Sequence, residues 1–494
     1  MMRRTRPWFL AFVAVSLIGD VAFAKRITPP KSFAHNVRHQ DDIDQRIMAP
    51  VDVAALLAQD AALSQPRVPL RVADALPLNL GLDNAVSWET LRDGGRLWRL
   101  RVSSPGAVFM SFKFSDFELP AGAELHFVSV HRNYHDGAYT QRHNRPARRF
   151  GSPMIPGDSA VIELYLPPGS GSASLQLESV SHGYRDVMGM GSIAARAGVS
   201  SAPGPDPISP AAAPPGGPFS CQRDIACPEG APYQDVKRAV AEGYDGVYIC
   251  SGQLINNVRQ DNRYLYLTAE HCEWWIDPPT MAYYWNYENS GCGTNDAPLT
   301  FSTGSTDLYH SAAADIDLLE LDGTDLESSY NIYFTGWNRS SAAPTMGAII
   351  SFPDDKPKQI SIENDPIIDC APGGCAGGWG PNFWRLEAYD VGVPEGGSSG
   401  GALLDQNNLL VGTLTGGVGT NCTNFEWDEY AKIHPQWSNL QPFLDPDATG
   451  ATSLLGRDHA DIPEPGALLQ LASGAAFLAL LAGRRRPRTQ VTSR

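Results

Sequence analysis

The chain has 494 residues, of which 43% are hydrophobic, and it carries a formal charge of −16 at pH 7. This length allows more than one domain with a buried core, and the acidic balance argues against a nucleic-acid partner because it repels phosphate. All eight cysteines lie between positions 221 and 422, which predicts disulfides within that part of the chain and an oxidising compartment.

The first 24 residues have the layout of a secretory signal peptide. A basic start is followed by an apolar stretch over residues 7–19 and by A-F-A at residues 22–24, the pattern of a cleavable signal. The alternative is a membrane anchor, but the apolar stretch is shorter than the roughly 20 residues that a span needs. We therefore expect the export machinery to recognise the chain, and the protein to be secreted or associated with the cell envelope.

Residues 25–195 are expected to form a domain without catalytic motifs. A helix is predicted over residues 51–63, and alternating apolar residues between Gly- and Pro-bearing turns predict a β-sandwich-like part over about 78–185. The predicted strands are 97–102, 107–112, 124–130, 160–166 and 173–180. A folding assistant or latency domain is the expected role, and a carbohydrate-binding module is the alternative. Residues 196–220, rich in Pro, Ala and Gly, predict an extended linker.

A serine in a glycine-rich turn is the first candidate for chemistry. V-P-E-G-G-S-S-G-G at residues 393–401 surrounds Ser399 with glycines, which permit a tight turn that exposes a hydroxyl next to backbone donors. Apolar runs at 402–404 and 409–414 would anchor this turn in a buried sheet. Glycine and serine clusters are also common in plain surface turns, so the motif alone does not establish catalysis.

A histidine and an aspartate precede this serine in the chain. T-A-E-H-C at residues 268–272 places His271 after a predicted buried strand at 264–267, and D-I-D-L-L at 315–319 opens another strand with a carboxylate. His, Asp, Ser is the order in chymotrypsin-type proteases. Asp315 and Asp317 share a strand face, so either could face the imidazole. A zinc site at His271 lacks a C-x-x-C or H-E-x-x-H pattern, and no metal or other cofactor is expected.

These three motifs resemble the triad motifs of the chymotrypsin clan. C-Q-R-D-I-A-C-P-E-G at 221–230 and Y-W-N-Y-E-N-S-G-C at 284–292 are similar to the bacterial lysyl endopeptidase family, and the likeness covers roughly residues 221–446. The resemblance implies an all-β fold, with a chymotrypsin-like double β-barrel over 221–447 preceded by the β-sandwich-like prodomain over 25–195. It also implies a monomer that binds protein or peptide substrates and hydrolyses peptide bonds.

The resemblance assigns a role to each candidate residue. His271 is the implied general base, Asp315 its partner and Ser399 the nucleophile that forms an acyl-enzyme, with the N–H groups of Gly397 and Ser399 as the oxyanion hole. Asp317 is then left as a solvated surface carboxylate. Ser398 precedes the nucleophile in place of the aspartate of the trypsin-like branch, which implies activation by removal of a blocking prodomain.

The resemblance further implies cleavage after lysine, with Asp428 accepting the substrate ammonium. Thr415 stands where family members carry a histidine in an L-H-G-G run, and the segment from Cys422 to Asp428 is shorter than in the family. Gly416 and Gly417 are expected to leave an edge backbone free to pair with an extended substrate. An exposed loop position for Asp428 is the alternative.

The cysteine pairing is also taken from the resemblance. The implied disulfides are Cys221–Cys422, Cys227–Cys292, Cys250–Cys272 and, for the two cysteines that remain, Cys370–Cys375.

Beyond the protease region, residues 448–462 are expected to be a linker. Residues 463–488 contain P-E-P, an apolar run and an arginine cluster, and they resemble the PEP-CTERM sorting signal of Gram-negative bacteria. The apolar run would enter the membrane transiently, the arginines would stay on the cytoplasmic side, and a sorting enzyme would be a partner. An ordinary tail anchor is the alternative.

The sequence as a whole predicts a secreted serine endopeptidase with a prodomain. The alternative from another class is a non-catalytic cell-surface binding protein on a protease-like fold.

Overall fold

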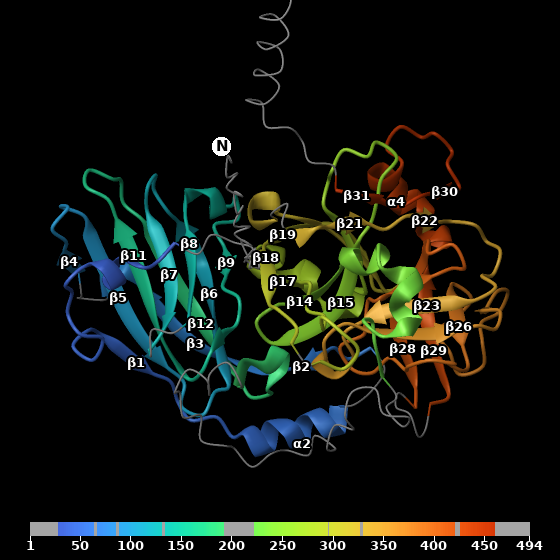
Figure 1. Cartoon of the computed structure of the whole chain (residues 1–494), viewed down its shortest axis with the longest axis horizontal. Helices are drawn as coiled ribbons and strands as arrows, with labels where there is room; N and C mark the ends of the chain where they lie inside the picture. Colours follow the sequence, from blue (N-terminus) through green and yellow to red (C-terminus); the bar gives the residue numbers. More distant parts are fainter. Residues whose placement is uncertain are drawn as a thin grey trace, which may run out of the picture.

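The computed structural model describes residues 28–63, 67–84, 88–130, 134–191, 222–294, 296–326, 330–419 and 425–459. The predicted signal peptide (1–24), the linker (196–220), the sorting segment (463–488) and the predicted Cys221–Cys422 disulfide lie outside the described residues. Among the described residues, none of the helices is long and apolar enough to cross a bilayer. Two β-rich halves lie side by side (Figure 1), with the predicted prodomain on one side and the predicted protease domain on the other.

The prodomain contains a β-sandwich of two sheets. In the described part of the chain, one sheet has the order β1-β5-β11-β7-β8 with β4 beside β5, and the other has the order β10-β6-β12-β3 with β9 beside β6. Large apolar side chains such as Leu100, Phe112 and Phe127 fill the space between the sheets, because alternate residues of each strand point inward. The strands are β1 Gln45–Ile47, β3 Ala73–Gly81, β4 Trp88–Thr90, β5 Arg96–Ser103, β6 Phe109–Glu118, β7 Glu124–Ser129, β8 His135–Tyr139, β9 Phe150–Gly151, β10 Ile155–Pro156, β11 Ser159–Leu166 and β12 Ser174–Gly183.

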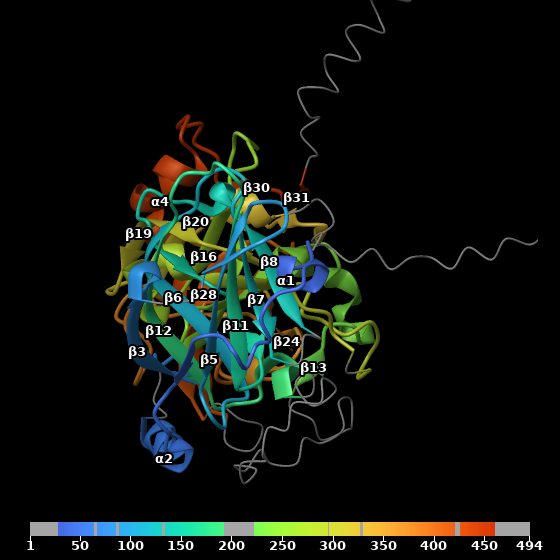
Figure 2. The ribbon, with the colours of Figure 1, turned by 90° about the vertical axis from the view of Figure 1, so that its left-hand side faces the viewer.

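The sandwich begins earlier in the chain than predicted. β1 pairs in parallel with β5, and β3 forms an edge of the second sheet, although the prediction started the sandwich at about residue 78. Figure 2 shows this half from its outer side, with α2 (Val53–Leu63) below it. This helix agrees with the one predicted over 51–63, and the other α-helices that lie wholly within the described residues are α1 (Lys31–Ala34) and α4 (Trp437–Leu444).

The protease domain consists of two antiparallel lobes. In the described residues the first lobe has the strand order β18-β17-β14-β15-β16-β20-β19, and the second has the order β13-β24-β23-β27-β28-β29-β26-β25 with β22 and β30 attached. The expected all-β class is therefore confirmed. The first-lobe strands are β14 Val240–Tyr244, β15 Tyr248–Leu254, β16 Leu265–Thr268, β17 Ala282–Trp285, β18 Thr300–Thr303, β19 Ser305–Ser311 and β20 Ile316–Leu321. The second-lobe strands are β13 Arg223–Asp224, β22 Trp337–Asn338, β23 Gly347–Ser351, β24 Gln359–Glu363, β25 Ile368–Asp369, β26 Phe383–Leu386, β27 Ala402–Leu404, β28 Leu410–Val418, β29 Trp427–Lys432 and β30 Ser453–Leu454.

The stretch predicted as a linker over residues 448–462 is packed against the protease domain as far as it is described. β30 pairs with β22, and β31 (Arg457–Asp458) pairs with β21 (Tyr333–Phe334). The polar composition suggested a loose segment, but its backbone completes two small ladders.

The prodomain and the protease domain share a buried interface. Phe109, Met154 and Met188 of the prodomain belong to the same apolar cluster as Tyr244 and Ile249 of the first lobe. The Met154 N–H donates to the Tyr284 hydroxyl at 2.8 Å, and the Met188 N–H donates to the Asp355 carboxylate at 2.7 Å. The two domains are thus held together by side-chain and backbone contacts between the described residues.

Candidate active site

His271 lies in a short turn that two covalent and polar contacts hold in place. Strand β16 is fully buried and ends at Thr268, and His271 follows in the 3₁₀ turn Glu270–Cys272. The Cys250–Cys272 disulfide joins this turn to β15, and the Thr268 hydroxyl donates to the Ser251 carbonyl at 2.8 Å. Because both cysteine sulfurs are in the disulfide, they offer no thiolate for the zinc alternative.

Asp315 orients the His271 ring. His271 Nδ1 is 3.0 Å from both carboxylate oxygens of Asp315, and the His271 backbone N–H donates to Oδ1 at 3.0 Å. An ionised carboxylate can only accept hydrogen bonds, so Nδ1 carries the proton and Nε2 is left as the acceptor. Nε2 is buried and has no hydrogen-bond partner within the described ranges, so this nitrogen is available to accept a proton.

The Asp315 carboxylate stays ionised although it is buried. Burial alone raises its pKa, but the charge of His271 and the hydrogen bonds from His271 and the Thr415 hydroxyl outweigh burial, and the pKa of Asp315 is lowered from its usual value. Thr415 is fully buried and its hydroxyl does not reach ideal hydrogen-bond geometry. Its side chain, predicted to contact substrate, therefore lies behind the Asp315 carboxylate.

The expectation of a solvated Asp317 is wrong. Its side chain is 0% exposed, and its strand β20 lies between β16 and β19, with Asp317 paired to Thr268. Burial and the nearby charges of Asp307 and Glu270 raise the pKa of Asp317 well above its usual value. Asp317 is therefore a buried group of the first lobe whose surroundings favour its protonated form, while Asp315 is the carboxylate that faces His271.

The loop that carries Ser399 is fixed to the strands around His271. The Ser251 N–H donates to the Ser399 carbonyl at 2.8 Å, and the Ser251 hydroxyl donates to the Gly397 carbonyl at 2.8 Å. Ser398 is fully buried and accepts a hydrogen bond from Ser351 at 3.0 Å, whereas Ser399 is half-buried. Of the two adjacent serines, Ser399 is therefore the accessible one.

Two backbone N–H groups of this loop remain free. In the part of the chain that the structure describes, the N–H groups of Gly397 and Ser399 donate no hydrogen bond, whereas those of Ser398 and Gly400 bind the carbonyls of Glu395 and Leu414. Gly397 has a φ of +90°, a backbone conformation that favours glycine. Unpaired donors next to an exposed hydroxyl suit a developing oxyanion.

Gly400 is required where this loop meets the His271 strand. Its φ is +80°, and a Cβ would lie 2.1 Å from Thr268 Oγ1 and 2.4 Å from the Ser251 carbonyl oxygen. We expect Gly400→Ala to lower kcat/KM of the mature enzyme by about 10²-fold, because displacing a reacting group by about 1 Å has effects of this size. Gly396→Ala is the matched control, since a Cβ there meets no atom closer than 3.7 Å. Equal kcat/KM values for the two variants in a fluorogenic peptide assay would contradict this role of Gly400.

Asp428 is a buried carboxylate at the end of the second lobe. It is 1% exposed, so the alternative that it lies on an exposed loop is wrong. The Tyr389 hydroxyl donates to Oδ2 at 2.9 Å, and burial, opposed by this hydrogen bond, raises the pKa of Asp428 to about 7. Among the described residues, no salt bridge pairs it with a cation.

The glycines predicted to bind substrate lie beside this carboxylate. Gly417 in β28 pairs with Asp428 in β29, and a Cβ on Gly417 would lie 2.1 Å from Asp428 Oδ1. Gly416 has a φ of +135°. Because Gly417 has no side chain, Asp428 Oδ1 can lie directly beside the β28 backbone.

Three predicted disulfides are formed, namely Cys227–Cys292, Cys250–Cys272 and Cys370–Cys375.

Sequence reasoning missed Tyr389, Ser251 and Arg67 at this site. Tyr389 and Ser251 have no motif that marks them, because their roles arise only when separate strands meet.

Comparisons with known proteins indicate the family that the chain resembles. Residues 216–431 match the family model for the lysyl endopeptidase C-terminal domain, and residues 47–184 match the model for the lysyl endopeptidase N-terminal domain. A lysyl endopeptidase of Pseudomonas aeruginosa is 27% identical over 473 residues, which cover 86% of this chain and 93% of that protein.

Solved protease structures resemble the chain less closely. The HtrA-type protease AlgW with tripeptide is 15% identical, with 43% of this chain and 62% of that chain covered and a TM-score of 0.31. A serine endoprotease from Yersinia pestis is 16% identical, with 45% of this chain and 69% of that chain covered and a TM-score of 0.31.

The chain is a serine endopeptidase with an all-β, chymotrypsin-like fold. More particularly, it is lysyl endopeptidase-like, since both its prodomain and its protease domain match models of that family.

Proposed function

We propose that the chain is the precursor of a secreted endopeptidase that cleaves after lysine with a triad of His271, Asp315 and Ser399. The observation that carries the proposal is the pairing of His271 Nδ1 with the ionised Asp315 at 3.0 Å, which leaves a buried Nε2 without a partner among the described residues. An imidazole held in this tautomer is a general base for a neighbouring hydroxyl.

In the proposed reaction Ser399 Oγ attacks the carbonyl carbon of the scissile bond while its proton passes to His271 Nε2. Asp315 stabilises the imidazolium, and the free N–H groups of Gly397 and Ser399 donate to the oxyanion. The imidazolium then gives its proton to the leaving amine, which leaves an acyl-enzyme. Water, deprotonated by the same imidazole, hydrolyses the ester and restores Ser399.

Asp428 is the proposed acceptor of the substrate lysine. A buried carboxylate whose pKa is raised to about 7 by desolvation gains most from an ammonium, because the cation restores the ionised form. A substrate with a neutral side chain would leave the carboxylate unpaired, which disfavours that substrate.

The proposed cellular route depends on both ends of the chain. The signal-like residues 1–24 would direct export, and the PEP-CTERM-like residues 463–488 would hold the chain at the membrane until a sorting enzyme acts. The enzyme would then work at the cell envelope or outside it on protein or peptide substrates, as a monomer.

The proposal is tested by labelling the mature protein with a fluorophosphonate probe and locating the adduct by mass spectrometry. We expect one adduct, on Ser399, and cleavage of a peptide library after lysine. An adduct elsewhere would remove Ser399 from the mechanism. If the protein is not labelled and does not hydrolyse an unstructured protein, the alternative of a non-catalytic binding protein is favoured instead.

A further inference from the structure

The prodomain segment from Arg67 to Arg71 lies against the catalytic residues of the protease domain. We propose that this segment occupies the substrate groove of the same chain and keeps it closed while the prodomain stays bound. The proposal rests on the proposed function, since it takes the groove to be the one that contains Ser399. The surface is thus a peptide-binding surface, and its occupant is a named stretch of this chain.

One end of the segment adds a strand to the first lobe. Leu70 and Arg71 form β2, which pairs antiparallel with Tyr248 and Ile249 of β15. The same strand continues to Ser251, whose N–H holds the Ser399 carbonyl at 2.8 Å. Strand addition to an exposed sheet edge is a common way to bind an extended peptide, so β2 covers an edge next to the Ser399 loop.

The Leu70 side chain reaches the turn that precedes the nucleophile. Ideal Cβ positions on Gly396 and Gly397 would lie 3.7 Å and 3.6 Å from the two Leu70 methyl carbons. Gly397 carries one of the two free N–H groups proposed for the oxyanion hole. An aliphatic side chain at ordinary van der Waals distance from this turn would exclude a substrate from the same place.

The other end of the segment, Arg67, lies beside Asp315, the carboxylate that pairs with His271. Arg67 Nε is 4.0 Å from Asp315 Oδ2, and the guanidinium stacks over Trp379 at 5.0 Å and over Phe383 at 5.7 Å. During catalysis Asp315 stabilises the imidazolium of His271. A second cation at this carboxylate competes with the imidazolium, so Arg67 opposes the reaction electrostatically as well as by filling space.

Only two residues join these ends, so the segment must cross the groove. Three residue steps span at most about 10 Å, and Val68 and Pro69 therefore pass between the Asp315 side and the Gly397 side of the site. Neither residue offers a cation to Asp428, and Arg67 is bound to Trp379 and Asp315 instead. The segment thus fills the groove without presenting the lysine that the proposed pocket requires.

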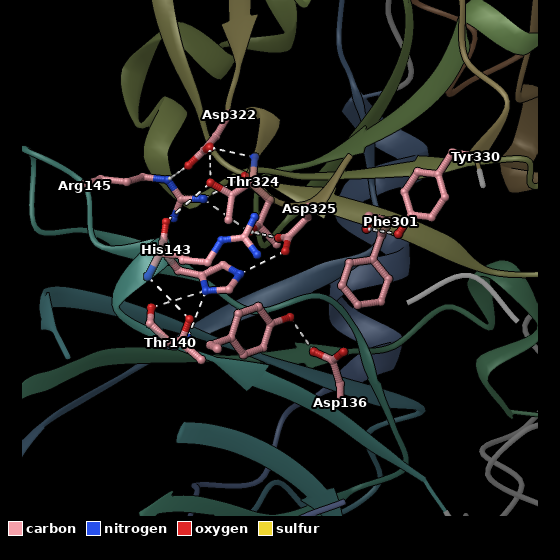
Figure 3. A network of polar contacts seen from close by, with 12 residues as sticks. Asp136, Thr140, His143, Arg145, Phe301, Asp322, Thr324, Asp325 and Tyr330 are labelled. Atoms are coloured by element: carbon pink, nitrogen blue, oxygen red, sulfur yellow. Dashed lines mark hydrogen bonds and ion pairs between the residues drawn. The ribbon is translucent and has the colours of Figure 1, made fainter. Parts of the chain in front are cut away.

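The segment is held by other parts of the prodomain. Arg71 Nε donates to Asp60 of α2 at 2.7 Å, so α2 holds β2 in place. At the main interface, His143 Nε2 is 2.9 Å from Asp325, and Arg145 Nε donates to Asp322 at 3.1 Å (Figure 3).

These interface contacts have a consequence for activation. The two pairs in Figure 3 join the prodomain to the first lobe through buried or nearly buried side chains, and Arg149 adds a pair with Asp277 at 2.7 Å. Paired groups out of water are costly to separate one at a time. A cut in the linker alone would therefore leave residues 67–71 in the groove, and the prodomain must also leave or be degraded.

The test uses the uncleaved full chain and two variants of the segment, Leu70→Asp and the milder Arg67→Ala. We expect each variant to react with a fluorophosphonate probe at least tenfold faster than the parent chain. In a Ser399→Ala background, which prevents autolysis, we expect faster amide hydrogen exchange at Ile249, which pairs with Leu70. The matched controls are Ile47→Asp and Arg46→Ala, which change the same residue types on β1, away from the groove.

The two readouts separate failure of this inference from failure of the proposed function. Unchanged exchange at Ile249 in both variants would overturn the inference, as would full reactivity of the uncleaved parent chain. If no form reacts with the probe, even after the linker is cut and the prodomain removed, the proposed function fails. The exchange measurement then still decides whether the segment covers β15.

Discussion

Replacing Ser399 by alanine should lower kcat for peptide hydrolysis by about 10⁶-fold, the scale measured when a triad serine is removed. The alanine cannot form the acyl-enzyme, and His271 Nε2 then has no hydroxyl to deprotonate. KM should change little, because Gly416, Gly417 and Asp428 remain in place. The measurement is kcat on a fluorogenic peptide with the mature enzyme, to which the prodomain is no longer bound.

The neighbouring serine provides a matched control. Ser398 is buried and bonded to Ser351 at 3.0 Å, so Ser398→Ala removes one buried hydrogen bond, a loss of about 1 kcal/mol of stability, and should reduce kcat by less than tenfold. His271→Ala added to Ser399→Ala should cause almost no further loss, because members of a triad act as one unit. A Ser399→Ala enzyme that keeps one per cent of its activity would contradict the assignment.

The fold and the candidate residues could be predicted because their signals are local. The alternation of apolar residues around residues 97–102 predicted the strand that became β5, and the apolar run 316–319 predicted β20. His271, Asp315 and Ser399 stand in short motifs that match a known family. The confirmed all-β class depends on such patterns, and each is contained within about ten residues.

What could not be predicted depends on contacts between distant segments. Asp317 looked solvated because the family motif gives the role beside His271 to Asp315, and its neighbours in sequence do not show that its side chain is buried. Thr415 looked like a groove residue, although it is buried behind Asp315. Arg67 shows no motif at all, and its role appears only because β2 pairs with a strand that lies almost 180 residues further along the chain.

Replacing Asp428 by asparagine should remove the preference for lysine, with kcat/KM on lysyl peptides reduced by about 10³-fold. Removing one partner of a buried charge pair costs 2–5 kcal/mol, and about 4 kcal/mol corresponds to this factor. Peptides with a neutral side chain at the same position should lose little or gain. The measurement is the ratio of kcat/KM for a lysyl peptide and its norleucyl analogue, which differ by the ammonium group.

Glu426→Gln is the matched control for this change. Glu426 is exposed and lies two residues away, so the substitution removes the same charge outside the pocket. It should leave the ratio of lysyl to norleucyl hydrolysis within about twofold, because an exposed charge is screened by solvent. If both variants lose selectivity equally, the preference arises from the general acidity of the surface and not from Asp428.

The same carboxylate makes the preference dependent on pH. Burial raises the pKa of Asp428 to about 7, so in the free enzyme the ionised form that attracts lysine becomes dominant only above that pH. The ratio of lysyl to norleucyl hydrolysis should therefore rise as pH increases from 5 to 8, and Asp428→Asn should make it flat. Effects of His271 cancel in this ratio, because both substrates need the same general base.

The stability contributed by Asp428 should fall as pH rises, whereas the preference for lysine should increase. In the unfolded chain an aspartate has a pKa of about 3.9, so between roughly pH 4 and 7 the unfolded state has released a proton that folded Asp428 still holds. The contribution of this group to the free energy of unfolding is therefore largest below pH 4 and is lost as pH rises towards 7. The measurement is the free energy of unfolding by urea at pH 4.5 and at pH 8 in a Ser399→Ala background. Between these two pH values, this free energy should fall less for Asp428→Asn than for the parent. An equal fall would mean that the carboxyl titrates normally.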